Sequence, residues 1–585
     1  MIEKMTKYTF IMLGSSRDSF LESLQSIGLI DIKRSRKPVD DYARGLYEES
    51  LERRKLIERI EKDDFSRDAS YVHLSKSLDA ARKEYASLLP WGSFSPSDLK
   101  GLAAAGFDVR FYCVPVGKFS SEWADIQALE IISRDERNVW FVTVGGDSLP
   151  VEECPAPSRS YEEVAIEIAA LEKELADKEE ALRGEKALLP QLRRELSSLL
   201  EKLARYQASA AAVKAAEDSL DIFVGFAPTA SDASLASQLD SLGVYYLSEP
   251  ATKEDNPPIK LHNNWFARNF ETLTGMYGMP VYDEFDPTPV LAPFFLLFWA
   301  FCMGDAGYGL LLIAMGFVVK RVNILGLKPH WRLVTTLGVG ATIIGFFLAT
   351  FFGINLTTVE WIPEGLRSLM LSGKLSFGGS SYDVSMVAAI AIGIFHICLA
   401  MVIKAIGLTK RFGLGAAIST WGWIVLIVGG LCTAGLALTS VIDSSVTRIV
   451  VIVIGVIALL SIYLFNTPGR NPAINFGAGL WDTYQMATGI LGDVLSYIRL
   501  YALGLAGGML GGAFNDLAAM TLGDNPTWQF LPFILIFVLG HALNFAMSCL
   551  GAFVHPLRLT FVEYFKNSGY EGKGDRYEPL QTIEN

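Results

Sequence analysis

The chain has 585 residues, of which 51% are hydrophobic and 19% are charged. Its formal net charge of -12 excludes a nucleic-acid-binding protein, because phosphate recognition requires a basic surface. Most of the charge lies in residues 1–285, whereas residues 286–585 are apolar runs separated by short polar loops, which predicts a soluble domain followed by a membrane domain. The six cysteines show neither metal-ligand spacing nor a disulfide pattern, so no metal site and no cofactor are expected.

Two segments of the soluble half repeat the same order of strand, amphipathic helix and strand. The first begins with KYTFIMLG at Lys7, and the second covers residues 221–250. Together they predict one composite α/β lobe, built from residues 1–40 and 217–285. The N-terminal apolar run lacks a cleavage pattern, so we interpret it as a strand and expect that this domain is not exported.

Residues 161–206 have apolar side chains at the alternating four-three spacing of a coiled-coil seam. Lys178 and Glu185 occupy two further seam positions, and Pro190 is expected to kink the helix. The apolar seam positions are Val164, Ile168, Leu171, Leu175, Leu182, Leu189, Leu192, Leu196, Leu199 and Leu203.

A charged helical stretch upstream has the length needed to pair with this seam. We therefore expect an antiparallel coiled coil with arms at 41–90 and 158–216, and a second α/β lobe at 91–157. The mainly α-helical soluble arm would be a dumbbell of two lobes joined by a strut. Self-association of a single coiled coil is the alternative, which the composite lobe makes less attractive.

The membrane half contains two short apolar runs, at 289–303 and 307–319, followed by six longer ones. If the two short runs were one helix, Gly304 and Asp305 would place a carboxylate inside lipid, so counting two gives eight crossings. Both termini would then be cytoplasmic. The longer runs are 333–353, 384–407, 415–440, 448–465, 476–521 and 529–565.

Basic side chains mark the loops expected on the cytoplasmic side. They are Lys320, Arg321, Lys328, Arg332, Lys404, Lys410, Arg411, Arg470, Lys566, Lys573 and Arg576. The last two apolar runs greatly exceed the roughly 20 residues that a perpendicular crossing needs, which predicts two long, tilted C-terminal helices.

Arg499 lies near the middle of the seventh apolar run. Placing a guanidinium at the centre of a bilayer costs about 2.5 to 3.5 kcal/mol, so such residues usually belong to an ion pathway or to a buried counter-ion. At about 100° per residue, Gln485, Ser496 and Arg499 share one helix face with several small residues. Asp493 lies at the border of this face, as a possible ion carrier or partner of Arg499.

The last run has a comparable polar face, and a histidine on it can exchange protons near neutral pH. We expect this face to line an aqueous half-channel. The alternative is that His541, Asn544 and Ser548 only cross-link helices and that Arg558 snorkels to the interface. His396 stands alone and is interpreted as a packing residue. The face comprises His541, Asn544, Ser548, Gly551, His555 and Arg558.

Three stretches of the sequence are distinctive: SYIRLYALGLA, AFVHPLRLTFVEYF and MYGMPVYDEFDPTPVLAPFFLLFWAFCMGDAGYGLLL. They resemble one family, the stator subunit a or I of V-type and archaeal-type rotary ATPases. The resemblance implies that Arg499 is the essential arginine that faces a rotor carboxylate, that Arg558 is the second arginine, and that His555 lies on the same motif. Gln485 and Ser548 stand where eukaryotic members have acidic residues.

The resemblance further implies a non-catalytic stator subunit that couples H+ or Na+ passage to ATP hydrolysis or synthesis. The implied partners are a proteolipid c-ring, peripheral stalk subunits E and G, a central-stalk-associated subunit at the ring, and the lipid bilayer. No Walker motif is present, so nucleotide chemistry would belong to the partners. Two alternatives are a secondary ion transporter with a cytoplasmic coiled coil and a membrane-anchored scaffold without transport activity.

Overall fold

The computed structural model describes a mainly helical chain with two sheets of four or more strands. It divides into two compact units, and the first contains residues 1–12, 29–32 and 222–579. The second contains residues 13–28, 33–221 and 580–585. The described residues are 1–583 without 36–37, 39, 63–64, 66–67, 121, 124–127, 146–148, 216, 218, 323–325, 361, 372, 378–379, 439–441, 466–470 and 522–525.

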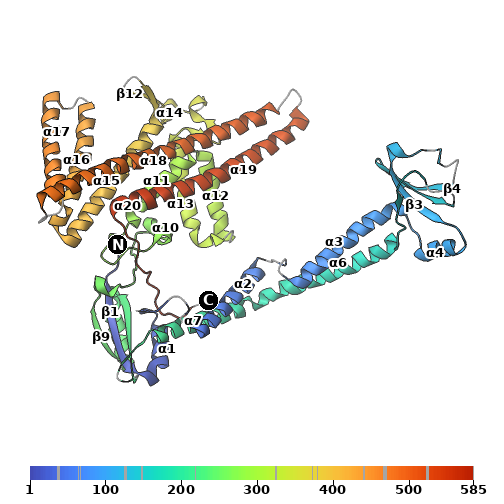
Figure 1. Ribbon diagram of the computed structural model, residues 1–585, viewed down its shortest axis with the longest axis horizontal. Coiled ribbons are helices and arrows are strands. Elements are labelled where there is room, and N and C mark those ends of the chain that lie inside the picture. Colours follow the sequence, from blue (N-terminus) through green and yellow to red (C-terminus); the bar gives the residue numbers. More distant parts are fainter. Residues whose placement is uncertain are drawn as a thin grey trace. The chain divides into compact units, whose positions relative to one another are not determined.

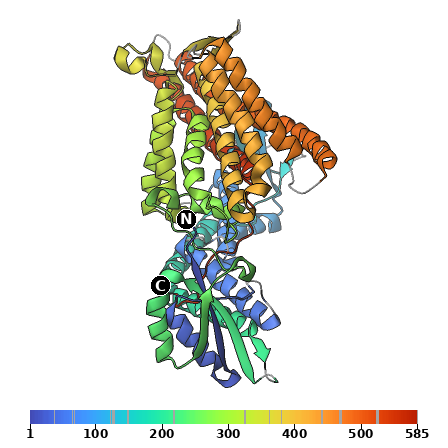
Figure 2. The ribbon, with the colours of Figure 1, turned by 90° about the vertical axis from the view of Figure 1, so that its left-hand side faces the viewer.

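The first sheet joins strands from both ends of the soluble half. Its order is β2-β8-β1-β9, with the short β7 pairing to β8, and the blue β1 lies among the later, green strands in Figure 2. β1 and β9 run antiparallel, from Thr6 opposite Pro250 to Ile11 opposite Tyr245. The prediction that the two segments share one sheet is confirmed. The elements are β1 (Met5–Leu13), α1 (Arg17–Ile27), β2 (Asp31–Ile32), β7 (Val213–Ala215), β8 (Leu220–Pro228), α8 (Asp232–Ser241) and β9 (Tyr245–Pro250).

The second unit contains the expected helical hairpin. α2 packs on α7 and α3 packs on α6, so that the charged stretch is indeed the partner of the seam. The two polar seam residues form ion pairs across it, Glu185 with Arg59 at 2.5 Å and Lys178 with Asp68 at 3.5 Å. The helices are α2 (Asp41–Glu61), α3 (Ala69–Leu88), α6 (Tyr161–Gly184) and α7 (Leu189–Ala210).

The expected interruption at Pro190 is present. α6 ends at Gly184, a 3-10 turn covers Glu185–Leu188, and α7 begins at Leu189 with the proline in its first turn. A proline is tolerated there because the N–H it lacks has no helical partner in any case. The apolar seam around it is continuous, with Ile57, Ile60 and Leu192 buried together.

A second, four-stranded antiparallel sheet lies between the two arms in sequence, as predicted for residues 91–157. Its order is β4-β5-β3-β6. Its core is a small cluster of buried side chains that includes Tyr112, Val139 and Phe141. The elements are α4 (Pro96–Ala104), β3 (Val109–Pro115), β4 (Ala128–Arg134), β5 (Asn138–Val144) and β6 (Glu153–Cys154).

Each of the eight apolar runs contains a helix in the described residues. Five of these helices are long and apolar enough to cross a membrane, so eight crossings and the orientation of the termini stay predictions. One residue of the expected basic loops, Arg470, lies outside the described residues. The helices are α11 (Thr288–Met303), α12 (Ala306–Arg321), α13 (Trp331–Phe347), α15 (Val384–Phe412), α16 (Leu414–Leu438), α17 (Ser444–Leu459), α18 (Pro472–Met520) and α19 (Pro526–Arg558).

Short elements connect these helices. π-helical turns follow α17 at Leu460–Leu464 and α19 at Leu559–Tyr564. The remaining elements are α9 (Trp265–Arg268), α10 (Glu271–Tyr277), β10 (Thr350–Phe351), β11 (Ile354–Asn355), α14 (Glu364–Arg367), β12 (Lys374–Phe377), β13 (Ser380–Asp383) and α20 (Phe565–Ser568).

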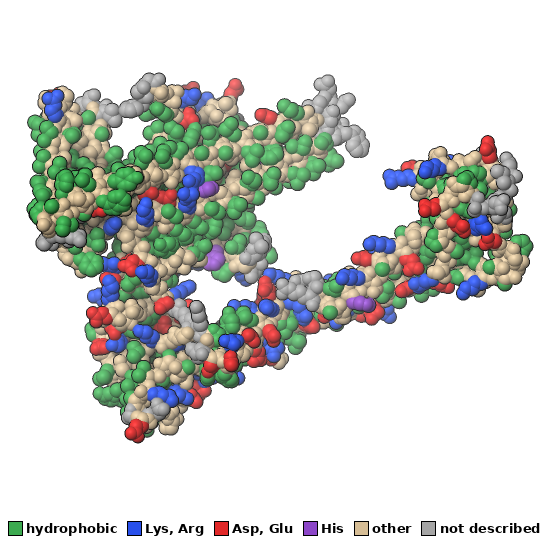
Figure 3. Space-filling view, viewed as in Figure 1, with side chains coloured by type: hydrophobic (Ala, Val, Ile, Leu, Met, Phe, Trp, Pro, Cys, Tyr) green, Lys and Arg blue, Asp and Glu red, His purple; other side chains and the backbone are tan. Residues whose placement is uncertain are grey.

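The two C-terminal helices are the longest in the membrane half. α18 has 49 residues, which is about 74 Å at 1.5 Å per residue, and α19 has 33. They lie side by side in Figure 1, and hydrophobic side chains cover much of their visible surface in Figure 3, whereas charged side chains follow the hairpin of the second unit. The expectation of two unusually long final helices is confirmed.

Glycine allows α18 to approach α11 closely. A Cβ atom on Gly504 would lie 2.4 Å from the carbonyl oxygen of Phe301, and Gly304 ends α11 with a φ of +62°. Only glycine fits both the contact and the left-handed conformation without strain. The break at Gly304 also confirms that the first two apolar runs are separate helices.

Candidate functional site

The polar faces of α18 and α19 meet along a seam. Asn544 on α19 donates to the carbonyl oxygen of Gly507 on α18 at 2.9 Å, and the Ser548 hydroxyl lies 3.2 Å from the position of a Cβ on Gly507. Further along, Gly551 faces Leu503. The residues expected to line a path therefore lie on two antiparallel helices that face each other, which the sequence pattern alone did not establish.

Arg499 lies half-buried on this seam. Its Nη1 is buried without a hydrogen-bond partner, and no described carboxylate lies within ion-pair distance of its guanidinium. Its charge acts on two neighbours, the Cys302 thiol of α11 and the His555 ring of α19. A permanent cation is thus held in a largely apolar bundle with hydrogen-bonding capacity to spare, which is the arrangement that an ion pathway requires.

Arg558 lies at the end of α19, with 53% of its side chain exposed. Its Nε is 3.9 Å from Oε1 of Glu563, a distance that allows attraction but no hydrogen bond. His555 lies within the electrostatic reach of both arginines, and its Nδ1 is buried without a partner. His555 is thus close to both arginines that the sequence analysis selected, Arg499 and Arg558.

A second carboxylate in this region was missed by the sequence analysis. Glu563 is 2% exposed and lies in the π-helical turn that follows α19, and its Oε2 has no hydrogen-bond partner. Asp493 of α18 lies close enough to interact with it electrostatically and is 8% exposed. Asn567 connects the two segments, because its Nδ2 lies 2.7 Å from both Oδ2 of Asp493 and the carbonyl oxygen of Glu563.

The other end of the seam is a closed hydrogen-bond network. His541 accepts or donates at both ring nitrogens, with Nδ1 2.8 Å from the Tyr308 hydroxyl and Nε2 2.9 Å from Oδ1 of Asn515. Because Nδ2 of Asn515 donates to the carbonyl oxygen of Phe352, its Oδ1 accepts, which assigns the His541 proton to Nε2. Tyr308 then donates to Nδ1 and accepts from Asn544 at 2.8 Å.

This network favours the cross-linking interpretation for two of the predicted channel residues. His541 and Asn544 are 5% and 1% exposed, and each of them is bonded to α12 and α18. Buried polar groups whose hydrogen bonds are complete fix helices in place. Their role in a half-channel stays a prediction.

Asp305 anchors the same end of the membrane half. Its carboxylate is fully buried and accepts from four backbone N–H groups, at 2.8 to 3.1 Å. Two of these groups begin α12, and two belong to the turn at Phe352 and Gly353. With four donors, this carboxylate joins the start of α12 to the turn after α13.

The remaining predicted residues have simpler surroundings. Gln485 is exposed on α18, and Ser496 donates to the carbonyl oxygen of Gly492 while lying beside Glu563. His396 is buried, bonds to the Tyr497 hydroxyl at 2.9 Å and stacks on Tyr564. The interpretation of His396 as a packing residue agrees with these contacts.

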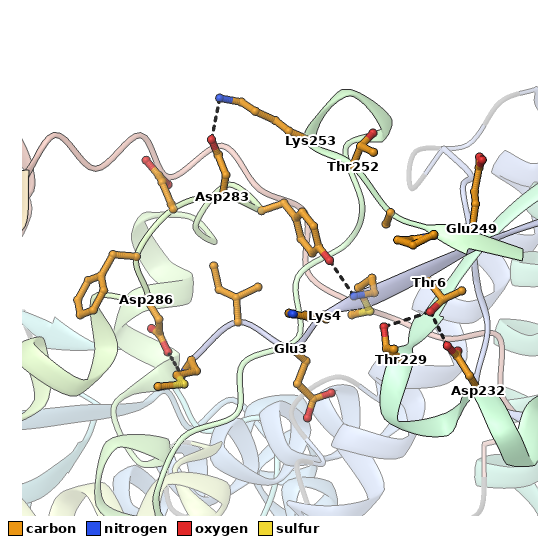
Figure 4. A pocket seen from close by; sticks show the side chains of 18 of the residues that line it. Glu3, Lys4, Thr6, Thr229, Asp232, Glu249, Thr252, Lys253, Asp283 and Asp286 are labelled. Carbon is orange, nitrogen blue, oxygen red and sulfur yellow. Dashed lines mark hydrogen bonds and ion pairs between the residues drawn. The ribbon is translucent and has the colours of Figure 1, made fainter. Parts of the chain in front are cut away.

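A cavity of about 1100 Å³ also lies in the first unit, and Figure 4 shows it from close by. Its carboxylates are engaged within the chain, Asp283 with Lys253 at 3.0 Å and Asp286 with the Met1 amino group at 2.9 Å. Asp232 accepts from the Thr6 hydroxyl at 2.7 Å. The two ion pairs join Met1 and Lys253 to the segment before α11. None of the predicted site residues lines the cavity.

The sequence is similar to curated proteins of archaea and bacteria. It is 31% identical over 456 residues to the A-type ATP synthase subunit I of Methanocaldococcus jannaschii, a match that covers 73% of this chain and 64% of the relative. The chain belongs to the A-type and V-type ATP synthase subunit I family. V-type ATP synthase subunit I of Borreliella burgdorferi is 24% identical over the full length of both chains. No family model matches the sequence.

Within this member of the subunit I family, the two arginines and the predicted polar residues lie on α18 and α19. V-type ATP synthase subunit I of Chlamydia pneumoniae, at 24% identity, covers 87% of this chain and 84% of its own length. The family and the five long apolar helices together indicate an integral membrane protein.

Proposed function

We propose that this chain is the membrane stator subunit of a V/A-type rotary ATPase and provides ion half-channels beside a proteolipid ring. The observation that supports this most strongly is the Arg499 guanidinium, which has no ion-pair partner among the described residues and a buried Nη1 without a hydrogen bond. An isolated carboxylate that moves past it would supply the missing counter-charge. The attraction grows as the local dielectric constant falls, so the pair forms best inside the bilayer.

The rotor carboxylate would pass Arg499 in its ionised form, between protonation from one side of the membrane and release to the other. Because an arginine stays charged at physiological pH, it also repels cations that would cross directly between the two half-channels. The inner half-channel would be lined by Gln485, Asp493, Ser496 and His555. The outer half-channel would run past Ser548, next to the hydrogen-bond network of His541 and Asn544.

The proposed partners follow from the family. The chain would contact a c-ring through α18 and α19, peripheral stalk subunits E and G and a central-stalk-associated subunit through its soluble arm, and lipid through its apolar surface. The helical hairpin of the second unit suits a strut, because ion pairs such as Arg59 with Glu185 reinforce its apolar seam. The chain itself would have no catalytic role, and its termini would be cytoplasmic in a prokaryotic plasma membrane.

A secondary ion transporter is the competing function. It would carry repeated, discontinuous helices with the ion site at their breaks. Arg499 lies instead well inside α18, which continues for 49 residues. This continuous helix favours the stator.

The replacement Arg499→Ala tests the proposal. We expect ATP-driven ion pumping in inside-out vesicles to be abolished, while the complex still copurifies with its proteolipid ring. Arg448→Ala is the matched control, because this exposed arginine lies on α17, away from the seam. Undiminished pumping by Arg499→Ala, or a chain that purifies without a ring, would exclude the stator function.

A further inference from the structure

The cluster around Glu563 brings two buried carboxylates close together. Glu563 and Asp493 lie on two segments that face each other, and the amide that joins them, Asn567, is neutral. The nearest cation, Arg558, is half-exposed and lies 3.9 Å from Oε1 of Glu563. A buried carboxylate oxygen without a donor is costly, so the unpartnered Oε2 is a place that a proton or a hydrated cation would fill.

The backbone explains why this carboxylate points inward. Pro556 interrupts the hydrogen bonding near the end of α19, and the chain widens into a π-helical turn at Leu559–Tyr564. A π-helical turn changes the angle between successive side chains, which brings Glu563 into the bundle instead of leaving it on the surface. Such turns are frequent at functional sites.

Other polar and ionisable groups surround Glu563 on several elements. On α18 the hydroxyl of Ser496 lies beside its carboxyl group, and Tyr497 lies within electrostatic reach of both carboxylates. Ser496 precedes Arg499 by three residues, so the cluster begins about one helical turn from that arginine. Arg558 on α19 and Asn567 on α20 also contact Glu563. Further ionisable groups lie around adjacent residues: His396 stacks on Tyr564, Lys404 contacts Gly569, and His555 lies within electrostatic reach of Arg558.

We propose that Glu563, together with Asp493, is the station at which a transported proton is exchanged between cytoplasmic water and the arginine end of the path. This inference rests on the proposed stator function and adds to it a residue and a position. A hydronium ion would transfer its proton to Oε2, forming an O–H bond and leaving water. That bond breaks when the proton moves on to the rotor carboxylate, and Arg558 stabilises the carboxylate left behind.

The replacement Glu563→Gln tests the station, because it keeps the shape and the hydrogen-bonding capacity but removes the ionisable group. We expect ATP-driven proton pumping in inside-out vesicles, whose outer face is the cytoplasmic one, to fall about tenfold or more. The dependence of the remaining rate on external pH should differ from that of the wild type, and Glu563→Asp should restore part of the rate. Glu571→Gln, at an exposed carboxylate of the tail, is the matched control.

Four outcomes would overturn the inference or separate it from the proposed function. Pumping by Glu563→Gln within twofold of the wild type, with the same pH profile, overturns the station. If that variant does not copurify with the ring, Asp493→Asn is measured instead, and an unchanged pH profile overturns the pair. If Arg499→Ala in the same vesicles still pumps, the stator function itself fails, whatever Glu563 does. Loss of Na+ pumping in place of proton pumping would reject the proton as the transported ion.

Discussion

The two ends of the seam between α18 and α19 differ in whether their buried polar groups have hydrogen-bond partners. At one end, Tyr308, His541 and Asn544 have their hydrogen bonds complete and are almost fully buried. At the other end, Arg499 and Glu563 each keep a buried polar atom without a partner. Complete networks fix one structure, whereas a buried polar atom without a partner in the chain has capacity left for water or an ion. The comparison separates the residues that hold the helices from those that we propose handle the ion.

The largest expected effect on stability is at Asp305. Asp305→Ala removes the acceptor of four backbone N–H groups, and each buried group left unpaired costs about 1 to 3 kcal/mol. We expect the chain to lose most of its stability, measured as the midpoint of thermal unfolding in detergent. Asp516→Ala, at an exposed carboxylate of α18, is the control. An unchanged midpoint would show that this carboxylate does not anchor α12.

A smaller effect on stability is expected at Tyr308. Tyr308→Phe leaves both the Nδ1 of His541 and one donor of Asn544 without a partner, at a cost of about 2 to 3 kcal/mol. Pumping per assembled complex should stay within about twofold of the wild type, because the group holds helices and carries no ion. Tyr484→Phe, at an exposed tyrosine of α18, is the comparison. Normal stability with lost pumping would instead move Tyr308 into the ion path.

The smallest effect on stability, and a large one on pumping, is expected at Arg558. Its side chain is half-exposed and its ion pair with Glu563 is long, so Arg558→Gln should change the free energy of unfolding by at most about 1 kcal/mol. We expect pumping to fall several-fold, as followed by vesicle acidification, while Arg448→Gln leaves it unchanged. If the two variants pump equally, Arg558 has no role in ion transfer and its side chain only extends to the membrane interface.

Much of the fold follows from local patterns in the sequence. Heptad spacing predicts the hairpin, alternating segments predict the shared sheet, and the Gly304 and Asp305 pair marks the break between α11 and α12. Helical projection also selects the faces of α18 and α19 that meet. These signals are spacings within one segment or, for the shared sheet, the same order of elements in two segments, so a single sequence is sufficient for them.

The hydrogen-bond partners and the second carboxylate depend on contacts that the sequence does not encode locally. Tyr308 and His541 are 233 positions apart, so no periodicity connects them. Glu563 escapes the projection of α19 because the π-helical turn after Arg558 changes the rotation per residue. The polar face could therefore be predicted as far as Arg558 and no further.

The glycine contact between α11 and α18 has a mechanical consequence. At Gly504 the backbone of α18 rests on the carbonyl oxygen of Phe301, with no intervening side chain that could rotate or compress. If a turning ring pushes sideways on α18, the force is transmitted directly from the backbone of α18 to that of α11. Such a contact is stiff, because no side chain lies between the two backbones. A bulkier residue at Gly504 would push α18 away from α11 and displace Arg499, so in the proposed stator this contact would set the distance between Arg499 and the ring.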